Sequence, residues 1–164
     1  MKSTASIVIV WLLVAALIYW AFDAMILRQH NPNSIQITSQ QSGDLVLKRS
    51  RDGHFRLSVL INGEPIVLMV DTGASNLTLD DAQAQRLNLS RGDTFMTQTA
   101  NGSVMGYASM IETLDLGTFQ LRNVPIGVIP KLGDEGLLGM NVLKNFAVQI
   151  QGDQMTIRSL SILK

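Results

Sequence analysis

The chain has 164 residues, with 13 basic and 13 acidic side chains, two histidines and no cysteine. This length allows one ordinary domain and a short additional segment. The balanced charge provides no basic surface for nucleic acid, so we expect no nucleic-acid partner. The absence of cysteine excludes disulfides and thiolate metal sites, and two histidines argue against a Ser-His-Asp triad or a zinc site. We therefore expect neither a metal nor a cofactor.

The N-terminal segment is apolar: residues 3–22 carry no charge, and residues 7–22 are apolar throughout. Twenty helical residues span about 30 Å, the thickness of a bilayer hydrocarbon core. We predict a membrane anchor in residues 1–27, helical over about 4–27, that contacts the lipid bilayer. A cleaved signal peptide is the alternative, but the apolar part is long and residues 21–24 lack a small-x-small cleavage site. Lys2 favours a cytoplasmic N-terminus, while Arg28 on the other side weakens that assignment.

A polar linker is predicted over residues 28–50, because Pro, Asn, Ser and Gln dominate and few side chains could join a core. Residues 45–47 form a possible short strand within it. His30 in this linker and His54 after it are both expected at the surface. Residues 51–164 are predicted to form the folded domain.

A β-hairpin begins the domain. Apolar residues at positions 55, 57, 59 and 61 alternate with polar ones, which predicts a strand with one buried face. Asn62 and Gly63 match a two-residue type I′ turn, in which both residues need positive φ. The return strand carries five consecutive apolar residues, Ile66 to Val70, so we expect both of its faces to be covered. It ends at Asp71, which we expect to lie in a buried place.

Further strands follow the hairpin. Asp80 is predicted to cap a short helix, with Gln83 as its capping-box partner. Residues 94–111 show a strand-turn-strand pattern, in which Gly106 suggests an arm that bends and is not deeply packed. Residues 114–129 and 148–158 indicate two more strand pairs around glycine turns. The pattern predicts a mainly β closed barrel with one or two short helices.

The residues after the return strand, Asp71, Thr72, Gly73 and Ala74, carry the chemistry. A hydroxyl and a sharply turning glycine next to a carboxylate can surround it with hydrogen-bond donors. This loop resembles the active-site loop of aspartic peptidases, in particular of retropepsin-like, membrane-anchored bacterial members. The resemblance covers roughly residues 53–158 and implies a retropepsin-like barrel.

Two other segments support the resemblance. Leu137, Leu138 and Gly139 are similar to the hydrophobic-hydrophobic-glycine segment that packs beneath the active-site loop of the family. Between the two segments, the turn at Thr99, Ala100, Asn101 and Gly102 lies where the family carries its substrate-covering flap. An ordinary exposed hairpin is the alternative interpretation of this turn.

The mechanism that the resemblance implies uses two carboxylates that share one proton, and one of them activates a water molecule. The chain has one Asp-Thr-Gly, and aspartates 44, 52, 93, 115, 134 and 153 lie beside turn residues and are interpreted as solvated. One catalytic carboxylate per chain requires a homodimer in which each Asp71 meets its mate. Thr72 is implied to brace the partner loop, and Gly73 to permit the close approach.

Together with the N-terminal helix, the resemblance implies a membrane-tethered aspartic endopeptidase that acts on polypeptides. The resemblance to membrane-anchored bacterial members also favours a periplasmic domain, which the charges alone do not decide. A catalytically silent dimeric module that binds peptides or serves assembly is the alternative. Ala74 adds a prediction on pH, because alanine cannot donate the hydrogen bond with which serine would favour an ionised carboxylate. We expect cleavage under mildly acid to neutral conditions.

Overall fold

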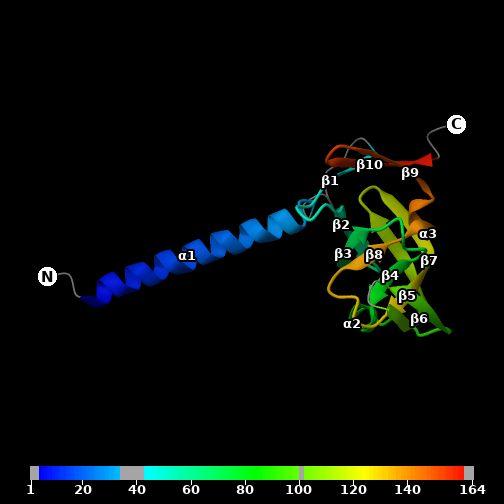
Figure 1. Ribbon diagram of the computed structural model, residues 1–164, viewed down its shortest axis with the longest axis horizontal. Helices are drawn as coiled ribbons and strands as arrows, with labels where there is room; N and C mark the ends of the chain where they lie inside the picture. The colour runs from blue at the N-terminus through cyan, green and yellow to red at the C-terminus, as the bar shows by residue number, and fades with distance from the viewer. Residues whose placement is uncertain (1–3, 34–42, 100–101, 161–164) are drawn as a thin grey trace.

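The computed structural model describes residues 4–33, 43–99 and 102–160. It contains three helices, two of them short, and a mainly β domain (Figure 1). In chain order the elements are α1 (Thr4–His30), β1 (Leu45–Lys48), β2 (Arg56–Ile61), β3 (Glu64–Val70), β4 (Leu77–Asp80), α2 (Asp81–Arg86), β5 (Thr94–Thr99), β6 (Gly102–Leu116), β7 (Phe119–Ile129), β8 (Gly136–Leu138), α3 (Met140–Leu143), β9 (Phe146–Gln151) and β10 (Gln154–Ser159).

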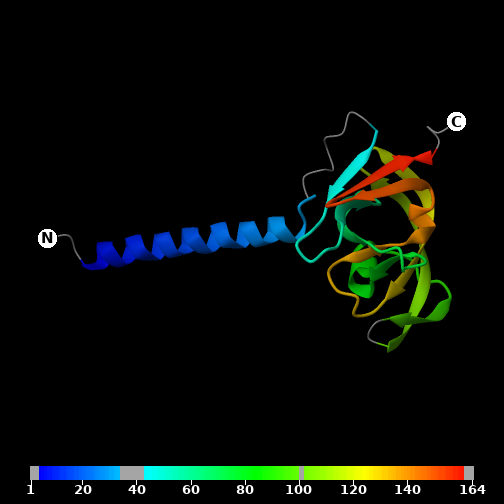
Figure 2. The same ribbon diagram turned by 45° about the horizontal axis from the view of Figure 1, so that its top comes forward.

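Helix α1 projects away from the β domain in both ribbon views (Figures 1 and 2). Its segment Ser6–Ile26 is long and apolar enough to cross a membrane, and none of it is buried against the protein. Large side chains such as Trp11 and Trp20 are about two-thirds exposed or more, at 68% and 72%. An apolar helix of this length without a protein partner is compatible with a single-pass membrane segment or a signal anchor. The helix continues to His30, three residues beyond its predicted end.

The barrel is closed by six strands in the order β2, β3, β8, β4, β7 and β6, with β6 pairing back onto β2. Closure uses the pairs Leu60 with Asp115 and Ile61 with Leu114. The interior is aliphatic, and Ile61, Leu68, Leu79, Leu114 and Leu138 are fully buried. This architecture confirms the predicted mainly β closed barrel.

A second, three-stranded antiparallel sheet lies beside the barrel, in the order β1, β10, β9. Strand β1 pairs with β10 from Leu45 with Ile157 to Lys48 with Gln154. Leu45, Leu47, Met155 and Ile157 are buried and join the same core as the barrel residues. The first strand of the domain is therefore stabilised by the last one.

The local turn and cap predictions are confirmed. Asn62 and Gly63 have φ values of 52° and 86°, as a type I′ turn requires. The Asp80 carboxylate accepts the Ala82 N–H at 2.8 Å, and the Asp80 N–H donates to the Gln83 side chain at 3.1 Å. Burial alone would raise the pKa of Asp80, but backbone donors from Ala82 and from the segment 131–133 outweigh it and lower that pKa.

Asn33, three residues after the end of α1, is fastened to the domain by hydrogen bonds of its side chain. The Asn33 side chain is 1% exposed and spans β1 and β2. It donates to the carbonyls of Lys48 at 2.9 Å and Arg56 at 2.8 Å, and accepts the Lys48 N–H at 2.8 Å. An asparagine amide can replace a missing strand neighbour in this way because it carries both donor and acceptor groups.

A buried arginine was missed by the sequence pattern. The strand pattern puts Arg56 on the solvated face of β2, yet its side chain is 5% exposed. Its guanidinium donates to both Asp52 oxygens at 2.8 and 2.7 Å and, through Nε, to Glu135 at 2.9 Å. Asp52 is thus an ion-pair partner and not simply a solvated turn residue. The hydrogen bond from Arg56 holds the pKa of Asp52 well below its usual range.

Candidate active site

The Asp71 loop follows directly on β3, next to the start of α3. The Asp71 N–H donates to the Leu138 carbonyl at 3.1 Å, which continues the parallel pairing of β3 with β8. One Asp71 carboxylate oxygen accepts the Gly73 N–H at 2.8 Å. In the described part of the chain this is the single hydrogen bond to that carboxylate. The Ser75 hydroxyl, which could have donated a second one, does not bond to it. The carboxylate is therefore oriented by the backbone of its own loop.

The loop is more exposed than the sequence predicts. Asp71 is half-buried, and Thr72 and Gly73 are exposed. The outer face of β3, with Val67 and Met69, is also only half-buried, so the expectation of two covered faces and a buried carboxylate is wrong for a single chain. Five consecutive apolar residues indicate burial but do not say whether the cover comes from the same chain.

Backbone contacts hold the loop from below. The Ala74 carbonyl accepts the Met140 N–H at 2.8 Å, and the Ser75 carbonyl accepts the Asn141 N–H at 3.0 Å. A Cβ on Gly139 would lie 2.8 Å from the Ala74 carbonyl oxygen and closer still to that of Asn76. Glycine is thus the residue that lets these two segments touch.

The three residues of the predicted support segment lie next to β3 and the Asp71 loop. Leu137 and Leu138 belong to β8 and pair with Met69 and Val70 of β3. Leu138 is fully buried, whereas Leu137 is half-buried. Sequence reasoning missed Asn141, whose amide accepts the Leu77 N–H and donates to the Pro125 carbonyl, both at 2.7 Å. Its position three residues after a buried leucine gave no signal of this.

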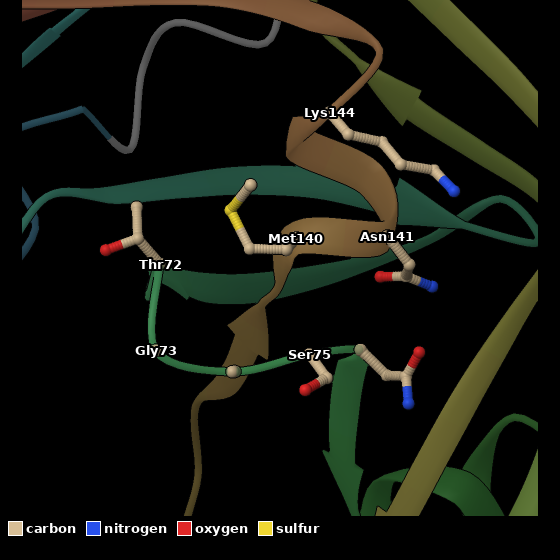
Figure 3. A pocket seen from close by; sticks show the side chains of 8 residues that line it. Thr72, Gly73, Ser75, Met140, Asn141 and Lys144 are labelled. Carbon is tan, nitrogen blue, oxygen red and sulfur yellow. The ribbon is translucent and has the colours of Figure 1, made fainter.

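An open pocket of about 450 Å³ adjoins the loop (Figure 3). Its lining residues come from the loop and from the α3 segment, namely Thr72, Gly73, Ala74, Ser75, Asn76, Met140, Asn141 and Lys144. Lys144 is the one charged residue among them and was not predicted. The side chain of Asn141 extends from α3 and that of Lys144 from the residue directly after it, while Thr72 and Ser75 belong to the Asp71 loop (Figure 3).

The predicted flap is the hairpin of β5 and β6. Thr99 and Gly102 flank its turn, where the Thr99 hydroxyl donates to the Gly102 carbonyl at 2.9 Å and Gly102 has φ 106°. Ala100 and Asn101 lie outside the described residues. The expectation for Gly106 is wrong: it is buried, and a Cβ there would lie 2.5 Å from the Val128 carbonyl. This glycine permits close packing of the arm on β7.

Strand β6 is also held at Tyr107, at the end of its pairing with β5 that lies away from the turn. Tyr107 is 4% exposed, and its hydroxyl donates to Asp81 at 2.9 Å. Burial, followed by this hydrogen bond, raises the pKa of Tyr107. The Arg91 guanidinium lies 4.1 Å from the centre of the same ring. The base of the hairpin is therefore fixed by these contacts.

Among the described residues, no group of three histidine, cysteine, aspartate or glutamate side chains could hold a metal ion. The site offers one carboxylate on a backbone-supported loop next to an open pocket. A carboxylate in such a position can act as a general acid or base on a bound water.

Comparison with known proteins defines the class of this fold and loop. The chain is similar to the crystal structure of a retropepsin-like aspartic protease from Rickettsia conorii, with 29% sequence identity and a TM-score of 0.59. The match covers 70% of this chain and 89% of the Rickettsia chain. The fold is thus that of a retropepsin-like aspartic protease. The family described as gag-polyprotein putative aspartyl protease matches residues 57–145, which include Asp71 and Gly139. The chain belongs to this family.

Two curated relatives are bacterial. An uncharacterized protein in the cobV 5′ region of a Sinorhizobium species is 30% identical over 125 residues, 73% of this chain and 54% of the relative. The uncharacterized protein RP867 of Rickettsia prowazekii (strain Madrid E) is 33% identical over 111 residues, 66% of this chain and 48% of the relative. The chain spans about half the length of the curated relatives it matches.

Proposed function

We propose that the protein is a membrane-tethered aspartic endopeptidase that hydrolyses peptide bonds as a homodimer. The observation that carries the proposal is the Asp71 carboxylate, held by the Gly73 N–H in a half-exposed loop at the end of a barrel strand. Membership of the aspartyl protease family supports the same activity.

The mechanism needs the Asp71 carboxylates of two chains. Two carboxylates about 3 Å apart cannot both ionise, so one is protonated and the other is charged. The charged one removes a proton from a bound water, which attacks the scissile carbonyl while the other carboxylic acid protonates the carbonyl oxygen. The exposure of Thr72 and Gly73 supports this arrangement, since both residues are free to meet a second copy across a two-fold axis.

The remaining predicted residues take supporting roles. Thr72 braces the partner loop, and Ala74 leaves the carboxylate without a side-chain donor. Thr99, Ala100, Asn101 and Gly102 close over an extended polypeptide, whose backbone can hydrogen-bond to both walls of the cleft. Helix α1 anchors each chain in the bilayer, and we assign the domain to the periplasm of a bacterium.

The test is cleavage of a mixed peptide library by the full chain in detergent micelles between pH 4 and pH 8. We expect Asp71→Asn to lower the cleavage rate at least about a hundredfold, because the pair loses its shared proton and its base. The wild-type rate should be highest at mildly acid to neutral pH. The matched control is Asp93→Asn, which neutralises an exposed carboxylate outside the loop and should leave the rate unchanged.

Equal cleavage by wild type and Asp71→Asn would contradict the proposal. A folded wild-type dimer that cleaves nothing but retains peptides would instead support the dimeric peptide-binding module. A rate that is still rising when the pH reaches 4, as an optimum near pH 2–3 like that of pepsin would produce, would contradict the expectation drawn from Ala74.

A further inference from the structure

A second open pocket, of about 540 Å³, lies where the membrane helix joins the domain. Its lining residues come from the end of α1 and from the end of β1 with the loop that follows, namely Gln29, Pro32, Lys48, Arg49 and Arg51. Three of the five are cationic and none is acidic. A cavity lined by cations and an amide fits an anion.

Lys48 and Arg51 have capacity left for a ligand. In the described part of the chain the exposed Lys48 ammonium forms no ion pair. Arg51 is placed by two contacts with Gln29: its N–H donates to the Gln29 carbonyl at 3.3 Å, and one guanidinium nitrogen donates to the Gln29 side chain at 3.2 Å. The other guanidinium nitrogens make no ion pair with a described carboxylate. A guanidinium held by one edge can present its other edge to a phosphate.

Arg49 is a fixed wall of the same pocket. Its guanidinium donates to the carbonyls of Gly53 at 2.8 Å and Gly152 at 3.0 Å, and lies 4.4 Å from the Phe55 ring centre. Its nearest carboxylate, that of Asp153, is 3.6 Å away and 84% exposed. Arg49 therefore adds positive charge and shape, while Lys48 and Arg51 provide the available donors.

The pocket lies at the depth of lipid headgroups. The apolar segment of α1 ends at Ile26, and Gln29 follows three residues later, about 4.5 Å further along the helix. The headgroup layer on each side of the hydrocarbon core is about 5–7 Å thick. Arg51, bonded to Gln29, thus lies at the level where phosphate groups are concentrated.

We propose that this pocket binds the headgroup phosphate of an anionic membrane lipid through Lys48 and Arg51. The depth of the pocket favours a lipid over free phosphate, because lipid phosphates are concentrated at this level whereas an anionic membrane surface repels dissolved phosphate. The inference rests on the membrane insertion that is part of the proposed function, but it does not depend on peptidase activity.

The experiment is native mass spectrometry of the full chain, released from nanodiscs that contain equal amounts of phosphatidylglycerol and phosphatidylcholine. The wild type should retain phosphatidylglycerol about tenfold over phosphatidylcholine. The double variant Lys48→Gln with Arg51→Gln should lose this preference, because two cations near anionic lipid account for most of such a ratio. The control, Arg86→Gln with Arg122→Gln, removes two exposed charges outside the pocket and should keep it.

Each other outcome would overturn the lipid site. Equal retention of both lipids by the wild type, or a preference unchanged in Lys48→Gln with Arg51→Gln, would exclude the pocket. Loss of the bound lipid in millimolar inorganic phosphate would assign the site to free phosphate. A chain washed from membranes by alkaline carbonate would contradict the anchor as well. Asp71→Asn should bind lipid as the wild type does, so failure of the peptidase proposal would be recognised separately.

Discussion

The geometry of the Asp71 loop depends on one glycine that lies outside it. Gly139 lets the start of α3 contact the carbonyls of Ala74 and Asn76, and these contacts set the path of the loop after the carboxylate. Orientation of catalytic groups within an ångström decides much of a rate. Small changes at Gly139 should therefore affect cleavage as well as folding.

We predict that Gly139→Ala destabilises the protein by about 1–3 kcal/mol, because the added methyl group meets backbone oxygens that cannot move independently. The measurement is the thermal unfolding midpoint of the full chain in micelles, together with the cleavage rate. The control is Gly127→Ala, where a Cβ would meet the end of the Phe95 ring at 3.2 Å and the ring can shift. Equal losses in the two variants would contradict this account.

A second prediction concerns the Asp52 carboxylate and pH. Arg56 lowers the pKa of Asp52 in the folded state, so the ion pair adds stability above the unfolded pKa of about 3.9. This contribution is lost as the pH falls through the lower, folded pKa. We expect Asp52→Asn to cost on the order of 1 kcal/mol at pH 7, since Asp52 is 43% exposed and solvent screens the pair.

The difference between wild type and Asp52→Asn should shrink as the pH is lowered from 4 towards 2, when followed by chemical denaturation at each pH. Asp153→Asn is the matched control, because that carboxylate is 84% exposed and lies 3.6 Å from Arg49. It should show little difference at any pH. A loss in Asp52→Asn that stayed constant down to pH 2 would contradict the ion-pair explanation.

Among the elements, α1 and β1 are joined in a way that composition does not reveal. Asn33 replaces a strand neighbour for Lys48 and Arg56, and these bonds connect the end of the anchor to both sheets. His30 adds a contact to Glu135 at 2.6 Å, just before β8. The end of α1 and the residues after it thus contact β1, β2 and the residue that precedes β8, the strand paired with β3.

We predict that Asn33→Ala lowers the free energy of unfolding by about 2–3 kcal/mol, because it leaves buried backbone groups of Lys48 and Arg56 without their partner. Denaturant titration of the full chain in micelles measures this. Asn76→Ala removes the same side chain from an exposed position and should cost far less. Comparable losses in the two variants would show that the Asn33 bonds add no stability.

Short-range chemistry made much of the fold predictable. The turn at Asn62 and Gly63 and the cap at Asp80 depend on neighbours within three residues, and both were predicted correctly. Arg56 and Asn33 depend on partners 79 and 15 residues away, so polarity alone misplaced both of them. Gly106 looked flexible because a glycine in a pattern does not reveal the backbone that approaches it.

Some residues of the candidate site could be predicted from the sequence and others could not. Asp71 and Gly139 stand out because their loops need particular residue types at particular positions. Lys144 and Asn141 do not, since an asparagine in a short helix and a lysine directly after it are ordinary surface residues in sequence. The exposure of β3 could not be predicted, because a run of apolar residues indicates burial without showing which segment covers each face.

The whole molecule provides the test of the dimer. If both carboxylates of the site come from Asp71, a dimer with one Asp71→Asn chain is inactive. With random assembly of equal amounts of the two chains, about one quarter of the dimers should be active. The measurement is the cleavage rate after wild type and Asp71→Asn are mixed, dissociated and reassembled. The control mixture, with Asp93→Asn, should retain the full rate, whereas a loss of only one half with Asp71→Asn would indicate independent subunits.

If α1 is inserted in a bilayer as proposed, its attachment to the domain restricts how two copies can face each other. Two chains inserted in one bilayer point the same way, so a two-fold axis that relates them must run along the membrane normal. The bonds of Asn33 and Arg51 leave little freedom between α1 and the barrel, so the tilt of each helix is transmitted to its domain. The Asp71 pair would then stand at one fixed height above the lipid. Such an enzyme would cleave only those substrates whose cleavage site lies at that distance from the bilayer.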